Sequence, residues 1–412
     1  MSGKKRPPRL LLLLPRRHYR AAAFLDAART LGASVLVGTD HRPALPSRDV
    51  LPVSFVAQDE ALRTILGKAR SRPIDGVLGV DESSATLASR CAAALGLPSN
   101  PVPAVETLHD KLAFRGWQAR AGQPHPRFRS LPLHASGRSA ARVATSLGFP
   151  LVLKPRALSG SRGVVRVDSA GELDGALARV ARVVSEGSAH NASCVAERYL
   201  PGREVALEVI VSNGHLHTLA LFDKPETGAG PFFPETVYLA PSKLGWTLTR
   251  ACLRAARALA NGLGIVRGAL HIELRVNAAG AFVIDAAARP IGGHCANVIR
   301  MIDGSRYESV LVRQALGLPL GTLRRERRAI GIAMLPVQAA GRVAAIEGLE
   351  EARAIPGVSD VLMTVAVGST VAPLPEGDPY IGFVFAGARS RSEVEPALRE
   401  ARSALRVIIR PG

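Results

Sequence analysis

Residues 271–293 read HIELRVNAAGAFVIDAAARPIGG, and this stretch decides how the rest of the chain is interpreted. Two short apolar runs flank the turn Asn277–Gly280, so the pattern predicts a β-hairpin. Glu273 and Asp285 lie within these runs, where a carboxylate is rarely buried without a partner. A divalent cation is such a partner, and ligation by oxygen alone favours Mg²⁺, whose other positions are taken by phosphate and water. The hairpin therefore predicts a metal site beside a phosphate.

Arg289 follows the second strand, and the Gly292-Gly293 turn after it could bring backbone N–H groups to a phosphoryl group. Two other interpretations of this stretch stay open. The carboxylates and the arginine could face solvent as ordinary surface charges. His271, Glu273 and His294 could instead hold zinc, although their spacing matches no H-E-x-x-H-like pattern.

A second segment, KPRALSGSRGV at residues 154–164, places a lysine at the end of an apolar strand and before a loop of small residues. Small residues allow backbone N–H groups to approach a polyphosphate, and Lys154 adds a point charge for its oxygens. The segment is not a P-loop, because no G-K-[ST] sequence opens a helix after it. The alternative is a Gly/Ser hairpin with an incidental lysine.

A third segment, AERYLPGRE at residues 196–204, predicts a strand that leads into a Pro-Gly turn. Such a hinge could offer its backbone to the edge of a nucleotide base. A carboxylate, from Glu197 or Glu204, could accept hydrogen bonds from ribose hydroxyls. On its own, the segment is equally a strand that ends in a turn.

The chain divides into three regions by the spacing of its apolar residues. In the first, residues 1–106, strands alternate with helices, which predicts a parallel sheet, but no G-x-G-x-x-G marks a dinucleotide site. The strands predicted there are Arg9–Pro15, Ser34–Thr39 and Gly76–Val80, and the helices are Arg20–Leu31 and Ser83–Leu95. Pro98–Pro103 is predicted to be a linker. Residues 107–322 show longer strands of antiparallel pattern, and residues 323–412 a small α+β unit.

The composition excludes several classes of protein. A hydrophobic content of 47% in 412 residues supplies a sizeable core, and no apolar run approaches the ~18 residues of a membrane span. Leu10–Leu14 is too short for a secretion signal, so we expect a cytoplasmic protein without membrane partners. The four cysteines form no C-x-x-C pair, so neither a disulfide framework nor a cysteine-ligated zinc site is expected.

The net charge of +19 raises the question of a nucleic-acid partner. Only seven of the 53 basic residues are lysines, and the arginines are scattered among alanine, glycine and proline. Aromatic residues make up 4% of the chain, which leaves few side chains for base stacking. We therefore expect an anionic small molecule as the ligand and no nucleic acid. The scarcity of lysine draws attention to each one that remains.

The motif residues, in their order along the chain, resemble the ATP-grasp superfamily: Lys111, Lys154 with its Ser-Gly loop, Glu197, Glu204, Glu273, Asp285 and Arg289. Three further segments look like the bacterial L-amino-acid ligase branch of that superfamily: FDKP at 222–225, GPFFPET at 230–236 and AARPIGG at 287–293. The last region, with GLEE at 348–351 and PGV at 356–358, is similar to the C-terminal domain of that branch.

The resemblance implies an ATP-grasp fold of mixed α/β and α+β class. Its parts would be a Rossmann-like N-terminal domain at 1–106, an ATP-grasp domain at 107–322 with a flap subdomain at about 150–203, and a C-terminal domain at 323–412. The implied activity is that of a ligase, which phosphorylates a carboxylate with ATP and joins the acylphosphate to an amine. The expected amine or acid is an amino acid, the expected cofactor is Mg²⁺ (or Mn²⁺), and the expected state is a monomer or a homodimer.

The resemblance also implies a role for each motif residue. The ATP phosphates would meet Lys111, Lys154 and a mobile flap that contains Ser159, Gly160, Ser161 and Gly163. Adenine and ribose would meet Glu197, Arg198, Tyr199, Leu200 and Glu204. The metal ligands would be Glu273 and Asp285, and the catalytic residues Arg289, Lys154 and Ser161. The substrate candidates are Lys224, Glu235, Arg289, Gly292, Gly293 and Arg300, some of which could be ordinary surface charges.

Two residues depart from the family pattern. Asp285 replaces the usual glutamate, so this carboxylate reaches less far, and Ala287 stands where an asparagine is expected, which leaves the number of metal ions open. Two other functions therefore stay open. One is a carboxylase or nucleotide-pathway ligase on the same scaffold, and the other is a non-catalytic ATP-binding regulatory protein.

The scattered charge predicts that DNA binding is weak, independent of sequence and steeply reduced by salt, because only non-specific phosphate contacts would contribute. Fluorescence anisotropy with a labelled duplex, measured at low and at physiological salt, checks this. A sub-micromolar complex that survives added salt would contradict it.

Overall fold

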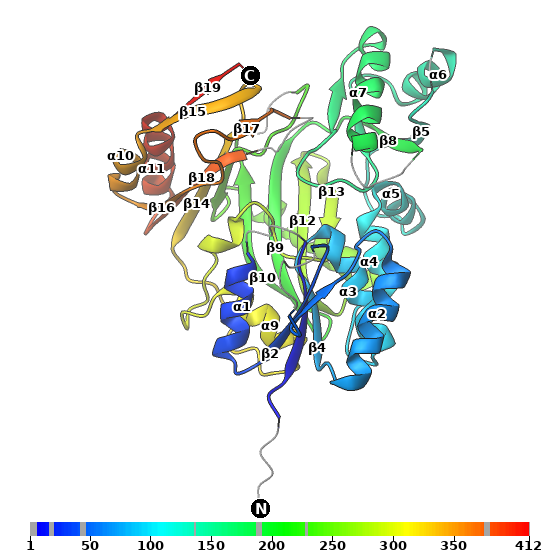
Figure 1. The fold of residues 1–412 in the computed structure, drawn as a ribbon. Helices are drawn as coiled ribbons and strands as arrows, with labels where there is room; N and C mark the ends of the chain where they lie inside the picture. The colour runs from blue at the N-terminus through cyan, green and yellow to red at the C-terminus, as the bar shows by residue number, and fades with distance from the viewer. Residues whose placement is uncertain are drawn as a thin grey trace, which may run out of the picture.

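The computed structural model describes residues 6–15, 20–41, 47–135, 137–186, 192–226, 230–374 and 380–411. These residues form four sheets, with helices packed against them (Figure 1). No helix in these ranges is long and apolar enough to cross a membrane.

The N-terminal unit is a parallel sheet in the strand order β3-β2-β1-β4. Its strands are β1 (Arg9–Leu13), β2 (Ser34–Thr39), β3 (Val50–Pro52) and β4 (Gly76–Gly79), and its helices α1 (Ala21–Thr30), α2 (Gln58–Ser71) and α3 (Glu82–Ala94). Leu10, Leu11, Leu12 and Leu13 are all fully buried, as expected for a central parallel strand that is covered on both faces. The predicted parallel sheet is confirmed, and the observed element ends differ by one or two residues from those predicted.

The predicted linker at Pro98–Pro103 is wrong at its end, because α4 (Val102–His109) begins there and α5 (Lys111–Arg120) follows at once. Pro103 occupies the first turn of α4, where a missing N–H costs nothing. The Asp110 side chain caps α5, since its carboxylate accepts hydrogen bonds from the N–H groups of Leu112 and Ala113 at 2.9 and 3.2 Å. This cap places Lys111 at the first position of the helix.

The flap unit is a sheet in the order β5-β8-β6-β7, and it lies beyond one end of the main sheet (Figure 1). Its strands are β5 (Phe128–Pro132), β6 (Leu151–Pro155), β7 (Val165–Val167) and β8 (Ser193–Arg198), and its helices α6 (Arg138–Leu147), η1 (Ala170–Glu172) and α7 (Leu173–Glu186). The loop between β6 and β7 contains the small residues that the sequence singled out.

The main sheet has eight strands in the order β13-β12-β9-β10-β11-β14-β18-β16. Five come from the central region: β9 (Arg203–Ser212), β10 (His215–Lys224), β11 (Val237–Ala240), β12 (Arg267–Asn277) and β13 (Gly280–Ala287). The other three come from the C-terminal region: β14 (Ala329–Pro336), β16 (Val358–Met363) and β18 (Tyr380–Ala388). Antiparallel pairing of β11 with β14 therefore carries one sheet across the domain boundary that we placed at residues 322 and 323.

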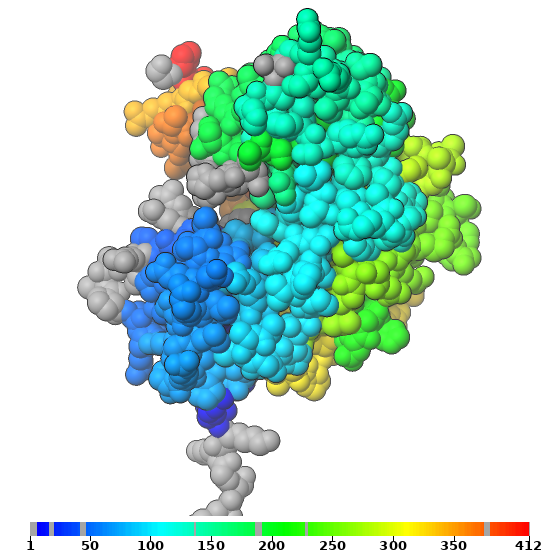
Figure 2. Space-filling model, turned by 90° about the vertical axis from the view of Figure 1, so that its right-hand side faces the viewer, coloured from blue at the N-terminus to red at the C-terminus, as the bar shows by residue number. Residues whose placement is uncertain are grey.

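The remaining elements cover this sheet or lie at its edge. The helices are α8 (Trp246–Leu263), η2 (Cys295–Val298), α9 (Tyr307–Ala315), α10 (Leu349–Ala354) and α11 (Arg391–Ala404). A three-stranded sheet is formed by β17 (Thr370–Val371), β15 (Gly341–Glu347) and β19 (Arg406–Arg410). In Figure 2 the N-terminal unit, in blue, lies at the lower left, the teal residues of the flap unit lie at the upper right, and the orange and red residues of the C-terminal unit lie at the upper left.

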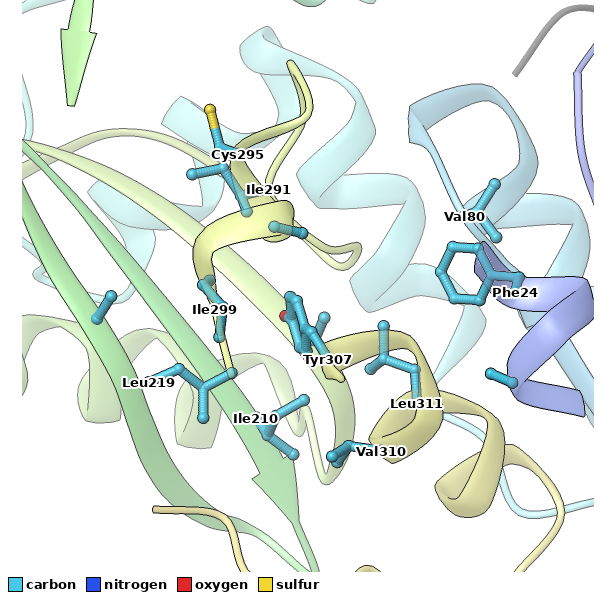
Figure 3. Close-up of a cluster of buried hydrophobic side chains, with 14 of the residues drawn as sticks. Phe24, Val80, Ile210, Leu219, Ile291, Cys295, Ile299, Tyr307, Val310 and Leu311 are labelled. Atoms are coloured by element: carbon cyan, nitrogen blue, oxygen red, sulfur yellow. The ribbon is translucent and has the colours of Figure 1, made fainter. Parts of the chain in front are cut away.

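One hydrophobic core joins the three regions. It contains Phe24 of α1, Ile210 of β9 and Phe385 of β18, each at most 2% exposed. Figure 3 shows Phe24 on one side of Tyr307 and Leu311, and Ile210 on the other. The N-terminal unit is thus held against the main sheet by α9, so residues from each region reach the same part of the molecule.

The packing of α11 against β14 leaves no room for a side chain at Gly331. A Cβ there would lie 2.6 Å from both Leu398 and Val394 of α11. Gly331→Val is therefore expected to lower the free energy of unfolding by about 1–3 kcal/mol, measured by urea denaturation.

Gly67→Ala is the matched control, because Gly67 lies in α2 with nothing within 4 Å of its Cβ position. It is expected to raise the free energy of unfolding by about 0.5–1 kcal/mol, the difference in helix propensity. A Gly331→Val protein as stable as the parent would contradict the packing of α11 described here.

Candidate active site

A cavity of about 1100 Å³ lies where the N-terminal, flap, central and C-terminal units meet. Most predicted site residues line it: Lys111, Lys154, Ser159, Gly160, Ser161, Glu197, Arg198, Tyr199, Leu200, Glu204, Glu235, Glu273, Asp285, Arg289, Gly292 and Gly293. Three predicted residues are absent from its lining: Gly163, Lys224 and Arg300. Tertiary structure therefore brings together motifs that lie as much as 180 residues apart in the chain, from about 111 to 293.

The predicted hairpin is formed by β12 and β13, and Glu273 lies directly opposite Asp285 in its register. Each carboxylate has a lysine near it: Lys224 Nζ is 3.7 Å from Glu273, and Lys111 Nζ is 3.2 Å from Asp285. Although burial raises the pKa of Glu273, Lys224 and His271 lower it well below its usual value. Glu273 is therefore an anionic acceptor beside the cavity, and with the facing Asp285 carboxylate it supplies the oxygen donors that Mg²⁺ prefers.

Two lysines mark the end of the cavity that faces the flap. Lys111 Nζ also donates to the backbone oxygen of Leu158, at 2.9 Å, in the loop after β6. Although burial lowers the pKa of Lys111, Asp285 and Glu82 raise it above its usual value, so the amine is a cation. Lys154 Nζ lies 2.9 Å from Glu197 Oε2. Both ammonium groups are therefore placed to meet an anionic ligand in the same cavity.

The loop between β6 and β7 takes its shape from residues with positive φ. Gly160, Ser161 and Gly163 have φ values of 64°, 59° and 70°. Such a φ is rare for a residue with a side chain, which makes Ser161 notable. A Cβ at Gly163 would lie 2.7 Å from Pro155, so this glycine shapes the loop from outside the cavity rather than lining it. Ser159, Gly160 and Ser161 all line the cavity, and Ser159 and Gly160 are the exposed members of the three.

Glu197 is held by a cation that the sequence did not single out. Arg115 Nε lies 2.8 Å from Glu197 Oε1, and its Nη1 donates to Gln118 at 2.7 Å. Burial raises the pKa of Glu197, but Arg115 and Lys154 lower it below its usual value. Glu197 therefore orients Lys154, and the next three residues of this segment, Arg198, Tyr199 and Leu200, are half-buried and line the cavity.

Lys224, an expected substrate contact, is directed at three carboxylates instead. Its Nζ lies 2.5 Å from Glu204, 3.0 Å from Glu235 and 3.7 Å from Glu273, and the residue is 5% exposed. All three carboxylates line the cavity, whereas Lys224 does not. Its ammonium lies against all three carboxylates from outside the cavity, where its positive charge offsets theirs. The direct substrate contact is corrected to a supporting position.

Glu204 and Glu235 have further partners. Arg275 Nη2 lies 2.7 Å from Glu204 Oε2. The Tyr238 hydroxyl donates to Glu235 Oε1 at 2.6 Å, and the Glu235 backbone N–H donates to the Tyr380 hydroxyl at 3.2 Å. Glu235 is thus fixed at the border between the central unit and the C-terminal unit.

Arg289 faces the cavity from the N-terminal side, where Glu82 holds it. Its Nε lies 3.1 Å from Glu82 Oε2, at the start of α3. Although burial raises the pKa of Glu82, Arg289, His109 and Lys111 together lower it to about 2. The N-terminal unit therefore supplies a permanent anion that orients this guanidinium, and the sequence had not identified Glu82.

Ile291, two residues after Arg289, is held through both its backbone N–H and its backbone C=O. Its N–H donates to Glu208 Oε1 at 3.0 Å, and its C=O accepts from Arg20 Nη1 at 3.3 Å. Glu208 is fully buried and also accepts from the Tyr307 hydroxyl. These two hydrogen bonds fix the backbone just before the Gly292-Gly293 turn. The sequence did not predict Glu208 or Arg20 as site residues, because no local motif surrounds either of them.

His271 belongs to the same buried network. Its Nδ1 lies 3.0 Å from Glu208 Oε2, and its Nε2 lies 3.6 Å from Glu273 Oε1. Throughout the ranges described, no three His, Cys, Asp or Glu side chains gather closely enough to hold a metal ion by themselves. The zinc interpretation with His294 has no support there, whereas Mg²⁺ needs only the two carboxylates in addition to phosphate and water.

Arg300 is a second correction to the expected substrate contacts. It is exposed, forms an isolated β-bridge with Arg306 and is not among the residues that line the cavity. A charged residue close to a motif in sequence therefore need not line the same cavity.

Comparison with known families gives matches to three parts of the chain. The ATP-grasp N-terminal domain matches residues 25–99, the ATP-grasp domain residues 147–298, and the L-amino acid ligase C-terminal domain 2 residues 333–410. These matches cover most of the N-terminal unit, most of the flap and central units, and most of the C-terminal unit.

Individual proteins match over longer stretches. The protein y4rH of Sinorhizobium fredii is 27% identical over 93% of this chain and 81% of its own length. Alanine–anticapsin ligase of Bacillus subtilis is 26% identical over 65% of this chain and 61% of its own length. The crystal structure of L-amino acid ligase from Bacillus licheniformis has a TM-score of 0.81 and 27% identity, over 98% of this chain and 100% of that one.

Lys154→Ala is expected to weaken ATP binding, because it removes a charge-assisted phosphate contact worth about 1.5–3 kcal/mol, or roughly 10- to 150-fold in Kd. Isothermal titration with a non-hydrolysable ATP analogue measures this. Lys243→Ala is the control, since Lys243 is 60% exposed and pairs with Glu395 outside the cavity. An unchanged Kd in Lys154→Ala would show that the loop after β6 does not bind phosphate.

Proposed function

We propose that this chain, which belongs to the ATP-grasp superfamily of carboxylate–amine ligases, activates an amino-acid carboxylate as an acylphosphate and joins it to an amine. One observation carries the proposal. Two facing carboxylates, Glu273 and Asp285, share a cavity with Lys111, Lys154 and Arg289. Such a set neutralises phosphate charge and contains no nucleophile, which suits phosphoryl transfer from ATP to a substrate oxygen.

The nucleotide would lie between the flap and the main sheet. Lys111 and Lys154 would bind its phosphates, the backbone of residues 198–200 would meet the adenine edge, and Glu204 would accept from the ribose. Glu273 and Asp285 would hold Mg²⁺ or Mn²⁺, which when bound offsets the charge of the phosphate oxygens. These assignments use residues that already face one cavity.

In the first step, a substrate carboxylate oxygen attacks the γ-phosphorus of ATP, the bond to the bridging oxygen breaks, and ADP leaves. Arg289 would stabilise the charge on the transferring group, because its planar fork matches phosphoryl oxygens, and Glu82 keeps it oriented. In the second step, the amine nitrogen attacks the acyl carbon, inorganic phosphate leaves, and the nitrogen loses a proton. The products are an amide or peptide, ADP and phosphate.

The loop with Ser159, Gly160 and Ser161 would cover the reacting groups. An acylphosphate is hydrolysed by water, so a cover over the cavity preserves it for the amine. Ser161, in its unusual backbone conformation, would place its hydroxyl and N–H near the phosphates. The proposal places the reaction in the cytoplasm, where ATP is available, with the protein as a monomer or a homodimer.

An amino-acid substrate is supported by two observations. Glu235 presents a fixed carboxylate to the cavity, where it could accept a substrate ammonium. The similarity to alanine–anticapsin ligase, which by its name joins alanine to anticapsin, points to the same substrate class. Ala287, which also lines the cavity, favours the regulatory alternative, but the two carboxylates and Arg289 next to it favour catalysis.

Glu273→Gln and Arg289→Lys are expected to fold and to bind ATP, yet to form acylphosphate roughly 10²-fold more slowly, because each loses charge stabilisation of the transferring group. Hydroxylamine trapping of the acylphosphate measures the rate. Arg300→Lys, on the exposed surface, is the control and should match the parent. Normal turnover of Glu273→Gln at limiting Mg²⁺ would rule out the metal assignment.

Asp285→Glu tests the same site from the opposite direction. It restores the residue type that the family pattern leads one to expect, so a working Mg²⁺ site should keep substantial activity.

A pairwise screen of the twenty amino acids for ADP release tests the substrate class. ATP hydrolysis that depends on bicarbonate would favour the carboxylase alternative, and no phosphate release with any mixture would favour a regulatory protein.

A further inference from the structure

The cavity has two chemically different ends. The end formed by the flap, N-terminal and central units contains the charged residues described above. The opposite wall comes from the C-terminal unit, and the described residues of that unit add no charged side chain to the lining. We name this surface the apolar wall and define it by six residues: Val337, Leu362, Met363, Val365, Val371 and Phe383.

The wall comes from strands that continue the main sheet. Leu362 and Met363 lie at the end of β16, Phe383 lies on β18, and Val371 on the neighbouring three-stranded sheet. Leu362, Met363 and Val365 are half-buried, so part of their apolar surface faces the cavity. Apolar surface that faces water is unfavourable by about 25 cal/mol per Å², and a contiguous stretch of it marks a place where an apolar ligand group binds.

Two polar groups at this end have partners within the protein. The Thr364 hydroxyl donates to the backbone oxygen of Tyr380 at 3.0 Å, and the Tyr380 hydroxyl accepts from the backbone N–H of Glu235 at 3.2 Å. A charged side chain of a ligand would lose its water against the six wall residues without gaining an ionic partner from them. Such a loss costs a ligand far more than burial of an apolar group.

A continuous series of contacts links the wall to the charged end. Tyr380, which meets Glu235, has its ring 5.6 Å from that of Phe383, and the His294 ring lies 5.0 Å from Phe383 on the other side. Glu235 thus stands at the junction, next to Glu273 through their shared Lys224. A ligand with its ammonium at Glu235 could direct its carboxylate toward the charged end that contains Arg289, and its side chain toward the wall.

We propose that the acid this chain activates is an α-amino acid with a large apolar side chain, which binds against the apolar wall while Glu235 binds its ammonium. The proposal rests on the proposed function and specifies its carboxylate substrate. The wall selects by burial, so each methylene that it covers is expected to lower the KM about fourfold. It disfavours acidic and basic side chains, because the six residues that define the wall offer no partner for their charge.

Hydroxylamine trapping identifies the activated acid without any knowledge of the amine, because hydroxylamine captures the acylphosphate directly. The full-length protein is assayed with ATP, Mg²⁺ and one amino acid at a time. Leucine, methionine and phenylalanine are expected to give kcat/KM values at least about tenfold above that of alanine, whereas aspartate and lysine should give little hydroxamate.

Met363→Glu and Val365→Glu place a charge on the wall in two different positions. Each is expected to raise the KM for leucine at least tenfold, with little change in the KM for ATP, and to improve lysine relative to leucine. Val367→Glu is the matched control, because Val367 lies in the same segment, is 63% exposed and does not line the cavity. It should leave both KM values unchanged, and a thermal melt of each variant confirms that it is folded.

The outcomes separate this inference from the function on which it rests. Hydroxamate from aspartate, serine or lysine at rates equal to those for leucine would overturn the apolar acid and leave the ligase in place. Equal effects of Val365→Glu and Val367→Glu, both folded, would remove the wall from the binding site. Hydroxamate from no amino acid at all would overturn the proposed function and the inference together.

Discussion

Two carboxylates that face one another, Glu273 and Asp285, impose the constraint on which the rest of the site depends. Like charges on opposed strands repel, and the register of β12 and β13 leaves them no room to separate. Two cations are positioned to offset them: Lys224 rises from β10 below Glu273, and Lys111 approaches Asp285 from the start of α5. The Asp110 cap positions Lys111 at the start of α5, and the turn from β9 into β10 positions Lys224. Both features therefore serve the same pair of carboxylates. Under the proposed function, this balance of charge surrounds the place where the phosphates and the divalent cation would bind.

The N-terminal unit takes part in the site through buried charges, although it contributes few side chains to the cavity surface. Glu82 holds the guanidinium of Arg289, and Arg20, paired with Glu308 at 2.8 Å, binds the carbonyl of Ile291. Buried ion pairs add little to stability on balance, because desolvation offsets much of the attraction. Their placement around one short loop suggests a geometric role. They fix the backbone from which Arg289 and the Gly292-Gly293 turn project.

The C-terminal unit is part of the main sheet and not an appended module. Because β14 pairs with β11, and β18 and β16 follow, its apolar residues reach the cavity on strands that are hydrogen-bonded to the central unit. Strands position side chains with less freedom than loops do, so the shape of the uncharged wall is as well determined as that of the charged floor. Charge and apolar surface therefore meet in one cavity at a fixed distance, with Glu235 and Tyr380 at the junction.

The sequence by itself determined the elements whose signals are local. Apolar runs on either side of Asn277–Gly280 specify the hairpin, and the alternation before residue 100 specifies a parallel sheet, because both patterns depend on neighbours within a few residues. The scarcity of lysine also drew attention correctly to Lys111, Lys154 and Lys224, all of which lie at or just below the cavity. Only tertiary structure decided what each charge does. Lys224 supports carboxylates, Arg300 lies on the exposed surface, and Arg115, Glu82 and Glu208 hold the site from segments far away in the chain. A side chain's partner depends on which strands pair and which faces they bury, and no local pattern encodes that choice.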